Sequence, residues 1–193
     1  MNNPINRFRP SATDMIRMDH SHVMATFHRY KAETDPSTKQ ALANMICMAL
    51  ELHAKLEEEI FYPSMREVQA ERPLVDKSYP EHEEIHRLIG QLRTMDPNDP
   101  AFDRTFMDLM RDVLHHVADE ETTLLPDAEA ALGTERLQEI GARMLKRRMS
   151  LTMPMVPEMA RNMVRARPPV YFAAAAGALI GAGLVARRAF AAR

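Results

Sequence analysis

The chain has 193 residues, enough for one helical domain and an appendage. It has no tryptophan, six glycines and 16 methionines, and it is rich in strong helix formers, which favours an all-α fold over one built on sheets. Its only cysteine, Cys47, excludes an intrachain disulfide, and because the N-terminus has no apolar stretch we expect no secretory signal.

The net charge of -2 is unevenly distributed along the chain. Of the 25 basic residues ten lie after residue 142, where the only acidic residue is Glu158. The remaining part, residues 1–142, is therefore strongly acidic, which argues against nucleic-acid binding. The basic C-terminal part favours an anionic surface instead, and a membrane is the obvious candidate.

Apolar periodicity, capping residues and prolines predict four long helices. Their expected ranges are about 11–33, 37 to beyond 63, 80–95 and 101–132. Kinks are expected at Pro63 and Pro126, and Gly133 is expected to end the fourth helix. A shorter helix over about 134–149 follows. Short connections between long helices predict an up-down-up-down four-helix bundle over residues 1–149, with a C-terminal helical extension.

The composition changes after residue 149. Residues 150–169 are basic and rich in Met and Pro, as is typical of a linker. Residues 170–186 carry no charge, so we expect a C-terminal membrane helix over 170–189, at the short limit for crossing a bilayer. Its glycines have the spacing that lets membrane helices associate, which would allow self-association. The positive-inside rule would then place the bundle in the cytoplasm, anchored to the inner face of the membrane.

One spacing occurs twice in the chain. His53, Glu57 and Pro63 recur at the same offsets as His116, Glu120 and Pro126. A histidine and a carboxylate four residues apart lie on one face of a helix, so two helices could each offer nitrogen and oxygen ligands to a shared metal centre.

The other two long helices also carry histidine on their apolar stripes. His20 lies on the stripe of the first helix, and His82 and His86 share a face of the third. In the fourth helix His116 belongs to the apolar stripe, whereas His115 shares a face with aspartates. A single inward histidine is more often a hydrogen-bonded core residue than a ligand. The predicted metal ligands together are His20, His53, Glu57, His82, His86, His116 and Glu120.

Buried glutamates need a compensating cation, because desolvating an ionised carboxylate costs several kcal/mol. Iron, zinc, copper and manganese all accept imidazole and carboxylate ligands, but seven candidate ligands exceed what one zinc ion uses. The residues therefore favour two six-coordinate ions.

The four motifs, Asp19-His20, His53 to Glu57, His82 to His86 and His116 to Glu120, resemble those of the hemerythrin-like HHE cation-binding domain over about residues 12–130. The resemblance implies a cofactor of two non-haem iron ions, bridged by both glutamates and by an oxo or hydroxo group. It also implies an open position on one iron where dioxygen binds. Respiratory hemerythrins have His-x4-Asp as their last motif, and this chain departs from that pattern.

The expected function is the binding or sensing of dioxygen or a related diatomic. Iron buffering and the handling of nitric oxide or peroxide remain alternatives at the same centre, so whether the chain is an enzyme stays open. Residues expected from periodicity to form the oxygen pocket are Phe27, Ile46, Ile85, Leu109 and Val113.

Other classes of protein are also compatible with parts of the sequence. The segment HEEIH matches the zinc-peptidase pattern HExxH, with His82 and His86 on zinc and Glu83 as general base. This reading leaves His20 and both His-x3-Glu pairs unexplained. A ferritin-type centre would need two Glu-x2-His motifs, and only Glu83 with His86 supplies one. A metal-free helical scaffold is a further alternative, but it does not explain why so many histidines face the core.

Overall fold

The computed structural model describes residues 10–31, 33–68 and 73–166. Its α-helices are α1 Ala12–Phe27, α2 Pro36–Leu56, α3 Tyr62–Val68, α4 Pro73–Thr94, α5 Pro100–Asp119, α6 Leu125–Thr152 and α7 Val156–Arg165. Three short segments join some of them: the π-helical turns η2 Glu57–Phe61 and η3 Glu120–Leu124, and the 3-10 turn η4 Met153–Met155. The described residues contain no strand, which confirms the all-α prediction.

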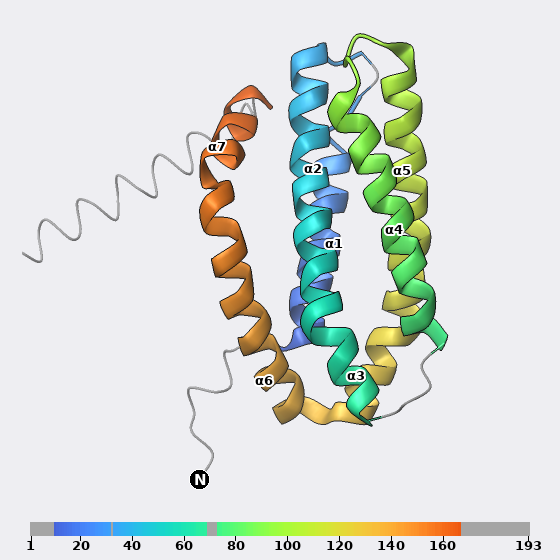
Figure 1. Ribbon diagram of the computed structural model, residues 1–193, viewed down its shortest axis with the longest axis vertical. Coiled ribbons are helices and arrows are strands. Elements are labelled where there is room, and N and C mark those ends of the chain that lie inside the picture. Colours follow the sequence, from blue (N-terminus) through green and yellow to red (C-terminus); the bar gives the residue numbers. More distant parts are fainter. Residues whose placement is uncertain (1–9, 32, 69–72, 167–193) are drawn as a thin grey trace, which may run out of the picture.

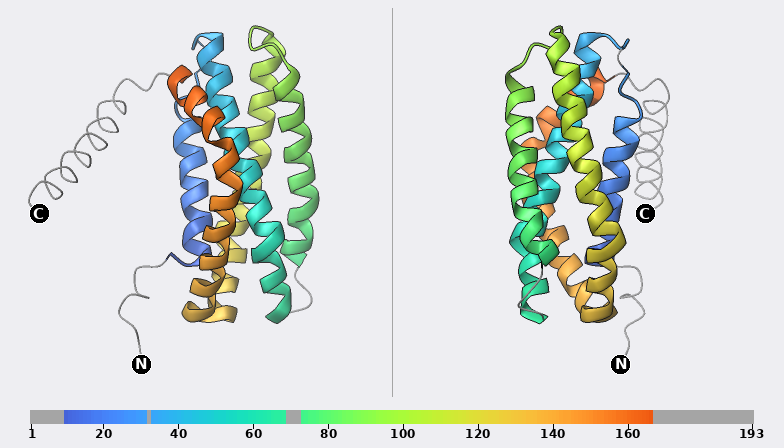
Figure 2. Two further views of the ribbon diagram at one scale, coloured as in Figure 1. Left: turned by 60° about the vertical axis from the view of Figure 1, so that its left-hand side comes forward. Right: turned by 90° about the vertical axis from the view of Figure 1, so that its right-hand side faces the viewer.

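Four of the helices form an antiparallel bundle (Figure 1). α1, α2 with α3, α4, and α5 run alternately up and down, as the short connections predict. α6 then turns back at the lower end and runs beside α1 and α2, and α7 packs on α2 (Figure 2). The predicted up-down-up-down bundle with a C-terminal helical extension is confirmed.

Helix starts follow the capping residues in the sequence. The Ser11 hydroxyl accepts from the Asp14 amide at 3.1 Å, and the Asp14 carboxylate accepts from the Ser11 amide at 2.9 Å, which completes a capping box. Asp99 caps α5 by accepting from the Ala101 amide at 2.8 Å, with Pro100 at the first helical position. The local sequence therefore fixes where these helices begin.

Two helix boundaries differ from the prediction. α1 ends at Phe27 and not at Glu33, because the following residues turn so that Tyr30 packs on Phe106, with ring centroids 4.1 Å apart. α4 begins at Pro73, so Pro80 lies inside the helix and not at its start. Val75, which is fully buried, ties this additional N-terminal part of α4 to the core.

The prolines of the repeated motif produce π-helical turns where kinks were expected. The Tyr62 amide donates to the Glu57 carbonyl and the Leu125 amide donates to the Glu120 carbonyl, both across five residues. Pro63 and Pro126 follow directly, and neither can donate to the carbonyl four residues back. The wider turn accommodates the missing donor, and such turns are frequent at functional sites.

Residues 150–166, the described part of the predicted linker 150–169, are mostly helical. α6 extends to Thr152, and α7 docks on α2 through buried Asn162 and Ala166. Gly133, at φ 69°, breaks the helical path of α6 as expected, but the helix resumes beyond it. The predicted membrane segment 170–189 lies outside the described residues. No helix in the described ranges is long and apolar enough to cross a membrane.

The core consists of two apolar clusters, one toward each end of the bundle. One includes Val23, Leu50, Ile85 and Val113, and the other includes Ile16, Leu56, Phe61 and Leu124. Along each bundle helix the inward histidine lies between residues of the two clusters. The fold therefore places a polar layer across the middle of an apolar interior.

Gly141 is expected to be intolerant of any side chain. A Cβ at this position would lie 2.5 Å from the Pro10 carbonyl oxygen and 2.9 Å from the Ser11 carbonyl carbon, both backbone atoms at the start of α1. Gly141→Ala should lower the free energy of unfolding by about 1–3 kcal/mol. Gly90→Ala is the matched control, because nothing lies within 4 Å of its Cβ, and it should raise stability by up to about 1 kcal/mol. Urea unfolding of both variants measures the difference.

Candidate metal centre

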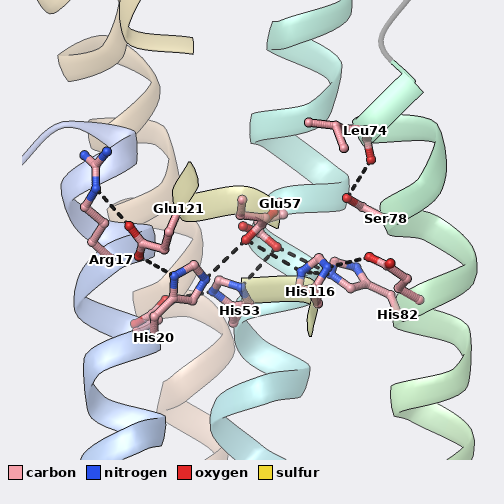
Figure 3. Close-up of polar contacts among 12 residues, drawn as sticks. Arg17, His20, His53, Glu57, Leu74, Ser78, His82, His116 and Glu121 are labelled. Atoms are coloured by element: carbon pink, nitrogen blue, oxygen red, sulfur yellow. Dashed lines mark hydrogen bonds and ion pairs between the residues drawn. The ribbon is translucent and has the colours of Figure 1, made fainter. Parts of the chain in front are cut away.

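Six of the predicted ligands meet in the polar layer (Figure 3). α1, α2, α4 and α5 each contribute one histidine, and the first residue of each π-helical turn contributes a glutamate. All six side chains are buried, with exposed fractions of 0 to 6%. They are His20, His53, His82, His116, Glu57 and Glu120. His115, in contrast, is exposed.

Each glutamate lies between two imidazoles. The Oε2 atom of Glu57 is 3.1 Å from the Nε2 atom of His53 and 3.5 Å from that of His82. The Oε2 atom of Glu120 is 3.2 Å from the Nε2 atom of His20 and 3.6 Å from that of His116. The Nε2 atoms of His82 and His116 face each other at 3.1 Å. All four histidines therefore present the same ring nitrogen to the middle of the layer.

The other nitrogen of each ring points outward to a second carboxylate. The Nδ1 atom of His20 is 2.7 Å from Glu121, and that of His82 is 2.8 Å from Glu58. The remaining two pairs are His116 with Glu81 at 3.0 Å and His53 with Asp19 at 3.5 Å. A carboxylate on Nδ1 fixes the ring orientation and leaves Nε2 free to bind a metal. Four such pairs in one layer are typical of a built metal site.

Tyr62 joins the two glutamates. Its hydroxyl lies 2.9 Å from Oε1 of Glu120 and 3.2 Å from Oε2 of Glu57, and its ring stacks on His82. Burial raises the pKa of Tyr62 well above its usual range, and both carboxylates add to the effect. Tyr62 therefore stays protonated and is placed to donate a hydrogen bond to one of the carboxylates.

The two buried glutamates of the layer would be stabilised in their ionised forms by an added positive charge. Burial raises the pKa of Glu57 well above its usual range, and the charge of Glu120 raises it further. Burial opposes ionisation of Glu120 as well, but the close contact with His20 and the neighbouring imidazoles lower its pKa to about 2. Burial lowers the pKa of His82 to about 3, assisted by His116. Neutral imidazoles and ionised carboxylates are the forms that bind metals, and a cation would allow both glutamates to ionise.

Buried polar atoms without a hydrogen-bond partner converge in this layer. Among the described residues they include the Nε2 atoms of His20 and His53, Oε1 of Glu57 and Oε2 of Glu120. The possible ligand atoms form two groups, within each of which all atoms lie within 4.8 Å of one another. One group contains His20, His53, Glu57 and Glu120, and the other contains Glu57, His82 and His116. The residues present therefore fit metal ions, and Glu57 belongs to both groups.

His86 is not part of either group and is exposed to solvent. The prediction that it faces inward with His82 is wrong, because Ile85 and Ile89 occupy the inward positions on that part of α4. The HExxH reading requires both histidines on one ion, and the structure does not bring them together. The centre thus has four histidines where the sequence predicts five.

His82→Ala is expected to weaken metal binding by about 100-fold. Loss of a residue that only supports a metal ligand weakens binding by about 10- to 100-fold, and loss of a ligand itself should cost at least the upper value. His86→Ala, one turn further along α4 and exposed, should leave the affinity unchanged. Competition with a chromogenic chelator measures both variants against the wild type. Equal losses in the two variants would place His86 on the metal.

A small cavity adjoins the four imidazoles. Its volume is about 20 Å³, room for one water molecule, and its walls are mostly aliphatic. Ile85 and Val113 line it, as the sequence predicts. Phe27, Ile46 and Leu109 do not. They pack in the apolar cluster nearer the α1–α2 connection, because periodicity identifies an inward side chain but not its height along the bundle.

The sequence did not single out Tyr62 or the four outer carboxylates as parts of the centre. A π-helical turn places residues five apart on the same side of the helix, so the side chain of Tyr62 lies next to that of Glu57. In the sequence, only the proline at position 63 indicates such a turn. Glu58 and Glu121 each follow a glutamate of the repeated motif directly and appear solvated by helical periodicity. Their contacts with His82 and His20 come from neighbouring helices, which local patterns do not reveal.

Comparison with known proteins agrees with this geometry. The family described as Hemerythrin HHE cation binding domain matches residues 11–128, which is more than half of the chain. The chain belongs to the hemerythrin HHE cation-binding family. It is therefore a metal-binding, hemerythrin-like protein, and the family typically takes iron.

Two curated relatives and one solved structure place this hemerythrin-like chain among known proteins. A DNA nickase of Nostoc sp. is 32% identical over 126 residues, which cover 65% of the chain and 36% of the nickase. An uncharacterized hemerythrin-like protein of Schizosaccharomyces pombe is 24% identical over 64% of the chain and 62% of its own length. The chain thus matches less than two thirds of either relative.

The solved structure is an HHE cation-binding domain-containing protein from Mycobacterium kansasii. It superposes with a TM-score of 0.62 at 18% identity, over 81% of this chain and 98% of the other. At this identity the likeness supports the fold alone.

Proposed function

We propose that this protein holds two non-haem iron ions and binds or senses dioxygen or a related diatomic molecule. The observation that carries the proposal is the pair of ligand groups sharing Glu57, each completed by two histidine Nε2 atoms. Two groups with a shared carboxylate suit two neighbouring cations better than one. The adjoining cavity is small and lined mostly by aliphatic side chains, which suits a small uncharged ligand.

Each ion would have its own set of residues. His20 and His53 would hold one ion, His82 and His116 the other, and Glu57 with Glu120 would lie between them. The iron pair, when bound, would supply the electrons and the open coordination position that diatomic binding requires. The outer carboxylates keep the four rings in place, and Tyr62 keeps a proton close to both glutamates.

The side chains around the cavity are mostly apolar. Val23, Leu50 and Val117 present aliphatic groups to its interior, and its only polar groups come from the metal-binding layer and Asp19. An apolar pocket of this size admits a neutral diatomic more readily than a charged or larger substrate. This favours gas binding over chemistry on an organic molecule.

Iron buffering, and nitric oxide or peroxide handling, use the same residues and stay as alternatives. We further propose that residues 170–189 attach the bundle to the cytoplasmic face of a membrane, on the strength of the uncharged stretch 170–186 and the arginines on both sides of it. Release of the full-length chain from membranes by carbonate extraction would refute this attachment. The activity named for the Nostoc relative belongs to a protein of which this chain matches about a third.

Anaerobic loading of the full-length chain with ferrous iron, followed by air, tests the diatomic function. A new visible absorption band that disappears under vacuum and returns with air is the expected result. Irreversible conversion to ferric iron would contradict reversible binding and favour buffering or redox chemistry. The same experiment with nitric oxide separates sensing of that gas from sensing of dioxygen.

A further inference from the structure

A second, much larger cavity lies outside the metal centre and is lined by residues of α1, α2, α6 and α7. Figure 2 shows α6 and α7 running along the outside of the bundle. Its volume is about 490 Å³, within the range of small-molecule binding sites. Nothing in the iron-binding proposal uses it. The cavity exists because the C-terminal extension covers the bundle from outside and does not pack closely along its whole length.

Methionines dominate the walls of this cavity. Those that line it are Met15, Met18, Met45, Met48, Met155 and Met159. Met15 and Met48 are buried, whereas Met18 is 66% exposed and forms part of the rim. Unbranched thioether side chains adapt their shape to a guest, and their sulfur atoms contact aromatic rings favourably. This lining therefore favours an apolar ligand with an aromatic ring.

One ion pair provides the main polar feature. Arg148 donates to both oxygens of Asp19, at 2.7 Å for the Nη1 contact, and both residues line the cavity. Because Asp19 already balances the charge of Arg148, the pair favours a neutral ligand over an anion. The side chain of Arg148 lines the cavity and is 25% exposed, so a guanidinium N–H that Asp19 does not use can donate to an acceptor oxygen on that ligand.

Asp19 also connects the cavity to the metal centre. Its Oδ2 atom lies 3.5 Å from Nδ1 of His53, and Asp19 lines the small cavity beside the imidazoles as well. Burial opposes ionisation of Asp19, but His53 and Arg148 together lower its pKa. A ligand that draws Arg148 toward itself changes how firmly Asp19 holds His53.

We propose that the methionine-lined cavity binds a neutral aromatic molecule carrying a carbonyl-type acceptor oxygen, which accepts a hydrogen bond from the guanidinium group of Arg148. We further infer that this ligand is linked to the metal centre through Arg148, Asp19 and His53. Only this second part rests on the proposed iron function. The cavity would thus make the metal centre responsive to a small apolar molecule.

Three naphthalene probes test the ligand chemistry on the full-length chain by equilibrium dialysis. 2-Acetylnaphthalene carries the acceptor oxygen, 2-ethylnaphthalene lacks it, and 2-naphthoate is an anion of similar size. The ketone is expected to bind one per chain, about fivefold more tightly than either of the others, since a hydrogen bond contributes about 1 kcal/mol. Equal binding of ketone and ethyl compound would overturn the role of Arg148, and tighter binding of naphthoate would overturn the neutral-ligand assignment.

Variants test the location. Ala49 lines the cavity, so Ala49→Phe should fill it and abolish saturable binding, whereas Ala118→Phe on the exposed side of α5 should not. Met159→Glu provides a second test should Ala49→Phe fail to fold. Met159 is 42% exposed at the rim of the cavity, so this change leaves the core intact and should weaken binding. Arg148→Lys keeps a charge beside Asp19 but should remove the preference for the ketone. Undiminished ketone binding in Met159→Glu and in folded Ala49→Phe would overturn the site.

Two further results decide the remaining points. Binding of no probe, together with a dimer mass in light scattering, would show that a second copy covers this face and would overturn the proposal. The link to the metal predicts that iron-loaded and metal-free protein differ in affinity for the ketone by about fivefold or more. Equal affinities would refute the link while leaving the iron proposal intact, because iron content is measured separately.

Discussion

Glu57→Gln is expected to reduce the iron content of the purified protein from two ions per chain to none, with an affinity loss of about 100-fold or more. Glu57 is the one residue that belongs to both ligand groups, and it is fully buried. Glutamine keeps the volume of the side chain but brings no negative charge. Each ion would therefore lose a ligand while the packing of the bundle is retained.

Glu83→Gln is the matched control for this variant. Glu83 lies one residue after His82 but is exposed, and it takes no part in either ligand group. Its substitution should leave iron content unchanged. If Glu83→Gln removed the metal and Glu57→Gln did not, the peptidase-like reading of HEEIH would be favoured over the shared-carboxylate centre.

Removal of the metal is expected to lower the thermal midpoint by about 10 °C. A ligand present at about 1,000 times its dissociation constant stabilises the folded state by about 4 kcal/mol. In a chain of this size each kcal/mol corresponds to about 2–4 °C. Without a cation, burial and the charge of Glu120 disfavour the ionised form of Glu57 and raise its pKa, so the metal-free layer loses a favourable charge balance. Calorimetry of iron-loaded and chelator-treated full-length protein measures the difference.

The same experiment on Glu57→Gln separates metal binding from general stability. Without metal this variant should melt at or above the metal-free wild type, because glutamine cannot place a second negative charge beside Glu120 in the buried layer. Chelator should have little effect on it. A wild-type midpoint that does not respond to chelator would contradict the view that a cation balances these carboxylates.

Much of the fold follows from local sequence signals. The capping box at Ser11 and the proline at position 100 each mark a helix start within one residue or so of where the structure has it. The inward stripes place His20, His53 and His116 in the buried layer. These signals succeed because helical periodicity and capping depend on residues only a few positions apart.

The parts that could not be predicted depend on contacts between distant segments. Whether His86 or Ile85 faces inward is decided by how α4 is rotated against its neighbours, not by the sequence of α4 alone. The pairing of His116 with Glu81 joins α5 to α4, and the docking of α7 on α2 depends on buried Asn162. The many prolines and basic residues after residue 149 suggest a linker. Composition alone does not show that α7 has a surface that packs on α2.

Native mass spectrometry of the full-length chain, purified from iron-replete cells, tests the central claim most directly. Two iron ions per chain in the wild type, both absent in Glu57→Gln, is the predicted result. A wild type that folds with no bound transition metal, or with a single ion that survives Glu57→Gln, would contradict a centre of two cations sharing this carboxylate.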